Sequence, residues 1–219
     1  MPVSPGHSSR ISAFLRGLWA DRQGVSFLEF ALILPILLTL GFYGTELAYM
    51  ATVNMQLGQI ATSIADNASR LGQTDNSSVT PTVTEKQIDS MLAGALIEGQ
   101  GFDFEENGRV ILSSLERSST GRQYIHWQRC RGKLAASSRY GAELAGLTGS
   151  TLAGMGATSL KAPANSAVMF VEVYYTYQPL FGSMFVGTPS FRREAAFMIR
   201  DDRNLTPGVT GGSGKSLCK

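Results

Sequence analysis

Two kinds of side chain in this 219-residue chain have the type and spacing to do chemistry. The first is Glu29, the only charged residue in the apolar run 25–44, VSFLEFALILPILLTLGFYG. A carboxylate in hydrocarbon is costly unless it is paired or neutralised, so Glu29 needs a cationic partner or a partly hydrated position near the cytoplasmic interface. The second is the cysteine pair, Cys130 and Cys218. If this part of the chain is exported, the pair can form a disulfide; otherwise it remains two thiols.

Signatures of catalysis and of metal binding are incomplete. The two cysteines and the two histidines, His7 and His126, have no zinc-ligand spacing. The segment GVTGGSGKS has Val209 where a phosphate-binding loop requires glycine. A net charge of +2 does not indicate a nucleic-acid partner. We therefore expect that the chain is not an enzyme and holds no cofactor or metal. We expect His126 to have a structural role and one acidic cluster to be solvated, namely Asp103, Glu105 and Glu106.

The apolar run has the length of a membrane span, because about 20 helical residues cross a bilayer. Residues 1–24 carry three arginines and one aspartate, which favours a cytoplasmic N-terminus and an exported C-terminal part. This leader is either a short amphipathic helix on the membrane or disordered. No small-x-small cleavage site closes the run, so it is expected to stay as a single-pass anchor in the lipid bilayer. Pro35 is expected to kink it.

Residues 45–72 are predicted to continue the helix with an apolar stripe. The stripe contains Met50, Val53, Leu57, Ile60, Ile64 and Leu71. It would pack on the chain's own domain, on neighbouring subunits, or on both at different turns.

Residues 73–201 are predicted to form an α+β domain. Thr84 and Gln87 fit a capping box that opens a helix over 84–97. Alternating apolar residues predict an antiparallel sheet of about four strands, at 109–118, 122–129, 166–178 and 190–200. In the second strand, Ile125 and Trp127 are expected on one face. Residues 132–165 are expected to be a long irregular loop, and 202–219 a Gly-rich tail.

The segment RQGVSFLEFALILPILL resembles the prepilin-peptidase site of type IV pilin-like proteins: Gly24 stands five residues before Glu29, and an apolar helix follows. The pair Glu29-Phe30, followed by ALILP, resembles the TadE-like minor pseudopilins of tight-adherence (Flp) pili. The leader is long for a pilin, and the domain is much larger than the very short major Flp pilin. The resemblance therefore favours a minor or accessory subunit with a type IV pilin-like fold.

The resemblance implies that a prepilin peptidase cuts between Gly24 and Val25. Glu29 would then be the fifth residue and would pair with an N-terminal amine, in its own or a neighbouring subunit. The implied partners are other pilins and pseudopilins and an inner-membrane pilus assembly platform. The implied location is the bacterial inner membrane, with the domain in the periplasm or incorporated into a pilus. The alternative is a signal-anchored periplasmic binding domain unrelated to pili, in which Glu29 is an interface residue.

Overall fold

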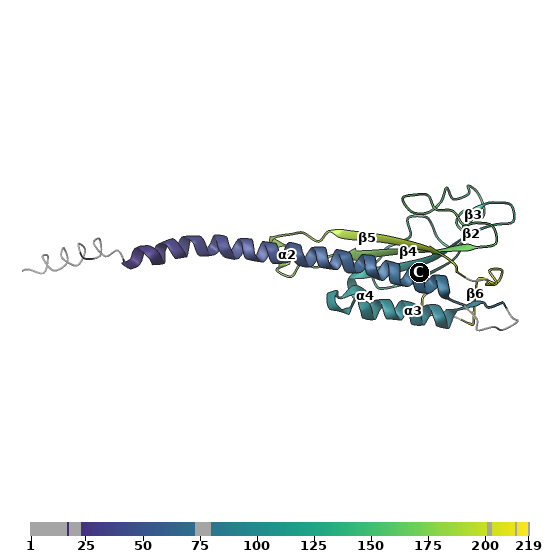
Figure 1. Ribbon diagram of the computed structural model, residues 1–219, viewed down its shortest axis with the longest axis horizontal. Coiled ribbons are helices and arrows are strands. Elements are labelled where there is room, and N and C mark those ends of the chain that lie inside the picture. The colour runs from purple at the N-terminus through teal and green to yellow at the C-terminus, as the bar shows by residue number, and fades with distance from the viewer. Residues whose placement is uncertain (1–16, 18–22, 73–79, 201–202, 213, 219) are drawn as a thin grey trace, which may run out of the picture. The chain divides into compact units, whose positions relative to one another are not determined.

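The computed structural model describes residues 17, 23–72, 80–200, 203–212 and 214–218 (Figure 1). Most of the predicted leader, and residues 73–79 at the start of the predicted α+β domain, lie outside the described residues. The chain divides into two compact units, 1–47 and 48–219. The second unit therefore includes the amphipathic half of the long helix as well as the α+β domain.

Helix α2, Gln23–Arg70, is a single helix of 48 residues, close to the predicted span. Pro35 lies inside it, and the helix continues past this residue. A proline has no N–H, so the carbonyl of Ala31 loses its usual helical donor there. The hydroxyl of Thr39 donates a hydrogen bond of 2.7 Å to the Pro35 carbonyl, which satisfies a polar group on an apolar surface. The expected kink at Pro35 stays a prediction.

Helix α3, Glu85–Glu98, begins where the sequence predicts. The backbone N–H of Gln87 donates to the Thr84 side chain, and the Gln87 side chain accepts from the Thr84 N–H, which confirms the capping box. Gly99 ends the helix. A Cβ at Gly99 would lie 2.3 Å from the Cβ of Phe104, so only glycine fits at this turn. Two short helices follow, η1 (Gln100–Phe102) and α4 (Phe104–Asn107).

Four antiparallel strands form the main sheet, in the order β3-β2-β4-β5. Their bounds are β2 Gly108–Arg117, β3 Gln123–Arg131, β4 Ala167–Thr176 and β5 Ser190–Met198. The loop between β4 and β5 contains the short helix η2, Gly182–Met184. This arrangement confirms the α+β layout and the antiparallel four-strand sheet.

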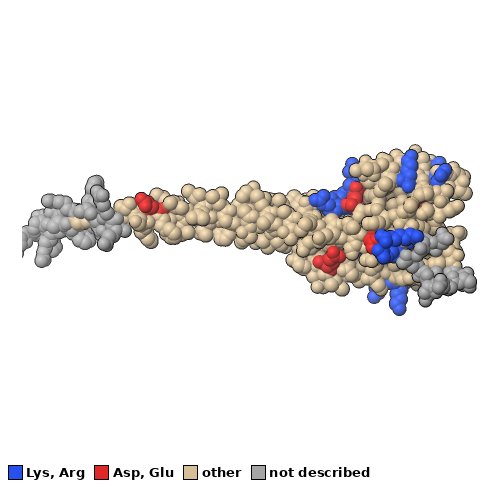
Figure 2. All heavy atoms as spheres, viewed as in Figure 1, with Lys and Arg blue, Asp and Glu red and all other residues tan. Residues whose placement is uncertain are grey.

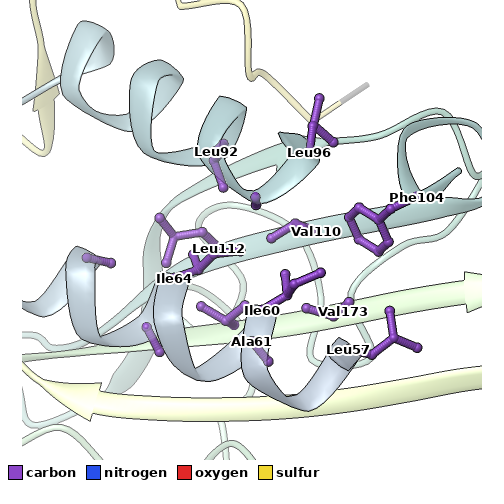
Figure 3. Close-up of a cluster of buried hydrophobic side chains, with 14 of the residues drawn as sticks. Leu57, Ile60, Ala61, Ile64, Leu92, Leu96, Phe104, Val110, Leu112 and Val173 are labelled. Carbon is purple, nitrogen blue, oxygen red and sulfur yellow. The ribbon is translucent and has the colours of Figure 1, made fainter. Parts of the chain in front are cut away.

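Helices α2 and α3 cover one face of the sheet and form the main core (Figure 3). The apolar stripe of α2, which in the structure is Val53, Leu57, Ile60 and Ile64, is buried against the sheet and α3. Their partners include Leu92, Val110, Leu112 and Val173. Over these turns the stripe therefore packs on the chain's own domain, while Met55 on another side of the helix is 61% exposed.

The other face of the sheet is covered by residues 132–165, which contain neither a helix nor a named strand. The loop is therefore irregular, as predicted, and it also completes a second core. Met155 and Ala162 pack there against strand residues that include Phe170. Gln123 exchanges two hydrogen bonds with the backbone of Ala162, at 2.9 and 2.7 Å. Because both faces are covered, the central strands β2 and β4 are buried along most of their length.

The prediction that Ile125 and Trp127 share a face is wrong. A bulge in β3 pairs Leu115 with Ile125 but Ser114 with Trp127, so His126 is an extra residue between them. Ile125 consequently lies in the second core and Trp127 in the main core.

A short parallel pair joins β1, Val83–Thr84, to β6, Val209–Thr210. No pattern in the sequence predicts this pair. It places a strand inside the segment expected to be a Gly-rich tail.

Candidate functional site

The first half of α2 presents an apolar surface along its length. The helix is long and apolar enough to cross a membrane, and the apolar window of that helix is not buried in the molecule. Figure 2 shows this part of the chain as almost entirely uncharged. Its exposed side chains include Val25, Phe27, Leu28, Phe30, Leu32, Ile33, Ile36, Leu37 and Leu40. Water does not solvate so much contiguous apolar surface well, so this surface suits lipid or other apolar helices.

Gly24, Val25 and Glu29 all lie in the first turns of this helix. Val25 and Glu29 are four residues apart, which places them on one face with a rise of about 6 Å between them. Among the described residues, Glu29 makes no ion pair. A Cβ at Gly24 would meet no atom within 4 Å, so the helix itself does not require a glycine at this position. Phe30 is one of the exposed apolar residues.

A disulfide joins Cys130, in β3, to Cys218 near the C-terminus. The Cα atoms are 4.8 Å apart. The backbone N–H of Cys130 also donates a 2.7 Å hydrogen bond to the Ser216 carbonyl, and Leu217 forms a bridge with Arg129. The C-terminal segment is therefore held against the edge of β3 by covalent and backbone bonds together.

A cavity of about 280 Å³ lies beside this disulfide. It is lined by both cysteines and by residues of β2, β3 and the irregular loop, including Arg109, Ile111, Gln128 and Ser138.

A buried ion pair lies behind the same segment. The guanidinium of Arg129 donates to both carboxylate oxygens of Glu85, with Nε 3.1 Å from each. It also donates to Glu143, which is half exposed, at 3.1 Å. Burial lowers the pKa of Arg129, but the hydrogen bonds and charge of Glu85 outweigh it and raise the pKa. The pair fixes the start of α3 to β3.

His126 is paired with a carboxylate and fits the structural role expected for it. Its Nδ1 lies 2.9 Å from Oε2 of the buried Glu116, whose other oxygen accepts a 2.8 Å hydrogen bond from Ser114. The hydrogen bond with Glu116 raises the pKa of His126, against the opposing effect of burial. The folded domain therefore keeps the proton on His126 to a higher pH than an unperturbed histidine would.

Glu172 is fully buried on the side of the sheet covered by the loop. It accepts hydrogen bonds from the Arg139 backbone at 3.1 Å, from the Tyr174 hydroxyl at 2.8 Å and from the Arg192 guanidinium at 3.0 Å, and another from Ser138. A buried carboxylate is tolerable only when its oxygens are satisfied in this way. The network anchors the irregular loop to β4 and β5.

The acidic cluster, Asp103, Glu105 and Glu106, lies exposed around α4. Glu106 accepts a hydrogen bond from Lys133. In the part of the chain that the structure describes, no three His, Cys, Asp or Glu side chains gather as a metal site.

The structure thus places the sequence-predicted residues in two separate groups, one at the start of α2 and one at the disulfide. The ion pair of Glu85 with Arg129 and the network of Glu172 were not predicted, because nothing in the sequence signals contacts between residues so far apart. In comparisons with protein-family models, curated proteins and solved structures, no match to this chain was found.

Proposed function

We propose that this chain is a TadE-like minor pseudopilin that acts in the biogenesis of a tight-adherence (Flp) pilus. One observation carries the proposal. Gly24, Val25 and Glu29 stand at the start of a helix that exposes an apolar surface and then continues, without a break, into the core of a folded domain. A pseudopilin needs this order of parts: a cleavable leader, a helix that leaves the membrane for a bundle, and a head that contacts other subunits.

In the proposed mechanism, a prepilin peptidase cuts after Gly24 on the cytoplasmic side. The new α-amino group of Val25 is positive at neutral pH, since such groups titrate near 8. Paired with the carboxylate of Glu29, in the same or an adjacent subunit, it neutralises a charge that hydrocarbon would otherwise penalise. The apolar helices of pilins and pseudopilins then pack together at the assembly platform, with the domain in the periplasm. The chain itself acts as a peptidase substrate and performs no catalysis.

Replacement of Gly24 tests the cleavage site. We expect wild-type protein extracted from membranes to begin at Val25 and Gly24→Phe to keep its leader. Gly41→Phe is the matched control, because Gly41 is also helical and a Cβ there also meets nothing within 4 Å. Normal processing of Gly24→Phe, or an intact leader in the wild type, would argue against the proposal.

Replacement of Glu29 tests the charge pairing. Glu29→Gln keeps the shape of the side chain and removes its charge, so we expect normal cleavage but loss of the subunit from the assembled pilus machinery. Comparing how wild type and variant co-purify with the other pilins measures this effect. Equal recovery would show that the carboxylate is not needed for assembly.

The second candidate function is a signal-anchored periplasmic binding domain. The cavity of about 280 Å³ beside the disulfide favours it, because small ligands bind in concave, partly apolar sites. This function predicts an intact leader and a rise in melting temperature with a small-molecule ligand. The pseudopilin proposal predicts cleavage.

A further inference from the structure

The β4–β5 loop, residues 177–189, is unusually apolar for an exposed connection. The chain contains no charged residue between Glu172 and Arg192, and the loop itself reads YQPLFGSMFVGTP. Loops normally carry charged and polar side chains because they run through water.

Three apolar side chains of this loop project outwards, whereas Val186 packs against the main core. Met184 is 82% exposed and Leu180 is 52% exposed, and Phe181 is exposed as well. Phe181 and Phe185 contact each other edge to face, with ring centroids 6.3 Å apart. A contiguous exposed group of this kind marks a surface that another apolar phase covers.

The position of the loop along α2 indicates that the membrane covers this apolar surface. Tyr177, the first loop residue, is fully buried, and its ring centroid lies 6.0 Å from that of Tyr49 in α2. Tyr49 stands five residues after Gly44, the end of the apolar run, which corresponds to a helical rise of about 7.5 Å. The headgroup region on each side of a bilayer is about 5–7.5 Å thick, so Tyr49 is expected at its outer edge. The loop therefore leaves the sheet at the level of α2 where the interfacial region is expected.

We infer that the β4–β5 loop inserts Leu180, Phe181 and Met184 into the outer-leaflet interface of the membrane that α2 crosses. The inference rests on the reading of residues 25–44 as a membrane span. Aromatic and long aliphatic side chains partition into this region. A loop without charged side chains also avoids the free-energy cost of removing charges from water. The loop would give the domain a second contact with lipid and hold it close to the membrane before assembly.

Lipid is favoured over a protein partner by the place of the loop, beside the turn of α2 that follows the apolar run. Its composition suits either occupant, because the cores of protein interfaces are also depleted in charge and enriched in aromatic residues and methionine. Two exposed carboxylates of α4, Glu105 and Glu106, lie at this end of the sheet, because Gly108 directly follows α4 and pairs with Tyr175 near the end of β4. Because these carboxylates would be repelled by anionic headgroups, nanodiscs of neutral phosphatidylcholine are the suitable probe.

The test places a tryptophan on the loop and measures its quenching by lipid. The full chain, with Trp19→Phe to reduce background, is reconstituted at one molecule per phosphatidylcholine nanodisc. Met184→Trp changes a side chain outside the core, so the fold is kept. We expect lipids brominated near the headgroup end of the acyl chain to quench this tryptophan about twofold. Leu144→Trp is the control: Leu144 is also an exposed apolar residue but lies in the irregular loop, so its tryptophan should be unaffected.

A third variant tests the membrane span separately from the contact of the loop with lipid. Leu37→Trp lies in the middle of the apolar run and should be quenched by lipids brominated deep in the acyl chain. Quenching at Leu37 without quenching at Met184 would overturn the loop contact and leave the span intact. Absence of quenching at both positions would overturn the span as well. Burial of Met184→Trp only when two chains share a disc would identify a second copy as the occupant and overturn the lipid contact.

Discussion

Leu57 tests whether the amphipathic half of α2 belongs to the core of the domain or is reserved for neighbouring subunits. Its side chain is fully buried in the main core, to which α2, α3 and the sheet all contribute. Substitution of a buried leucine by alanine costs about 2–5 kcal/mol, through lost transfer free energy and the cavity left behind. The site is enclosed by a four-strand sheet and a second helix, which cannot collapse freely, so we expect about 3–4 kcal/mol for Leu57→Ala.

Met55 provides the matched control. It lies on the same helix, two residues away, and is 61% exposed, so Met55→Ala should change stability by less than about 0.5 kcal/mol. A difference of about 3 kcal/mol between the variants is more than a hundredfold in the folded-to-unfolded ratio, since each 1.4 kcal/mol is about tenfold.

Urea unfolding of the full chain in detergent measures the difference. Trp127 reports on it, because this residue is 4% exposed and belongs to the same core, and Trp19→Phe removes the other tryptophan. Equal midpoints for Leu57→Ala and Met55→Ala would refute the assignment of the stripe to the domain core. The stripe would then have to be stabilised by other subunits.

Three further predictions concern the charged and covalent links of the domain. Opening the disulfide with Cys218→Ser removes a link between residues 88 apart and should lower stability by about 4–5 kcal/mol, measured against the oxidised wild type by urea unfolding. Glu85→Gln leaves a buried guanidinium without its main partner and should cost about 3–5 kcal/mol, whereas Glu143→Gln, at a half-exposed site, should cost under about 1 kcal/mol. The pKa of His126 is raised by Glu116 in the folded state. The contribution of His126 to the free energy of unfolding should therefore be complete below pH 6.5. It should be lost as the pH rises through the pKa of His126 in the folded state.

Each of these predictions can fail clearly. Equal midpoints with and without the disulfide would mean that the C-terminal segment adds no constraint. Equal effects of the two glutamine variants would mean that burial does not distinguish Glu85 from Glu143. His126→Gln should remove the pH dependence above pH 6.5, and an unchanged dependence would assign it to another group.

Much of the fold follows from local patterns in the sequence. The apolar periodicity predicts α2, the pairing of Thr84 with Gln87 predicts the start of α3, and alternating apolar residues predict the four strands. These signals work because each depends on neighbours within one or two turns or along one strand.

The parts that were missed depend on distant contacts. The bulge that separates Ile125 from Trp127 is set by the pairing with β2, and period-two alternation alone cannot show an inserted residue. The cover on the second face of the sheet comes from a loop whose sequence has no periodicity. Its anchor, Glu172, is an isolated acid in the most apolar strand of the chain, and two of its partners, Arg139 and Arg192, come from sequence-distant segments.

The candidate site also contains one part that the sequence predicts and one part that depends on distant contacts. The spacing of Gly24 and Glu29 is local, so their positions on one helix could be read from the sequence. Cys130 and Cys218 could be named as a pair but not placed, because their meeting depends on the C-terminal segment lying along β3.

The most direct test of the proposed function is the N-terminal sequence of the full-length protein after expression with a prepilin peptidase and extraction from the membrane. The account predicts that the mature chain begins at Val25, with Glu29 as its fifth residue. A chain that begins at Met1 in the presence of an active peptidase would contradict it.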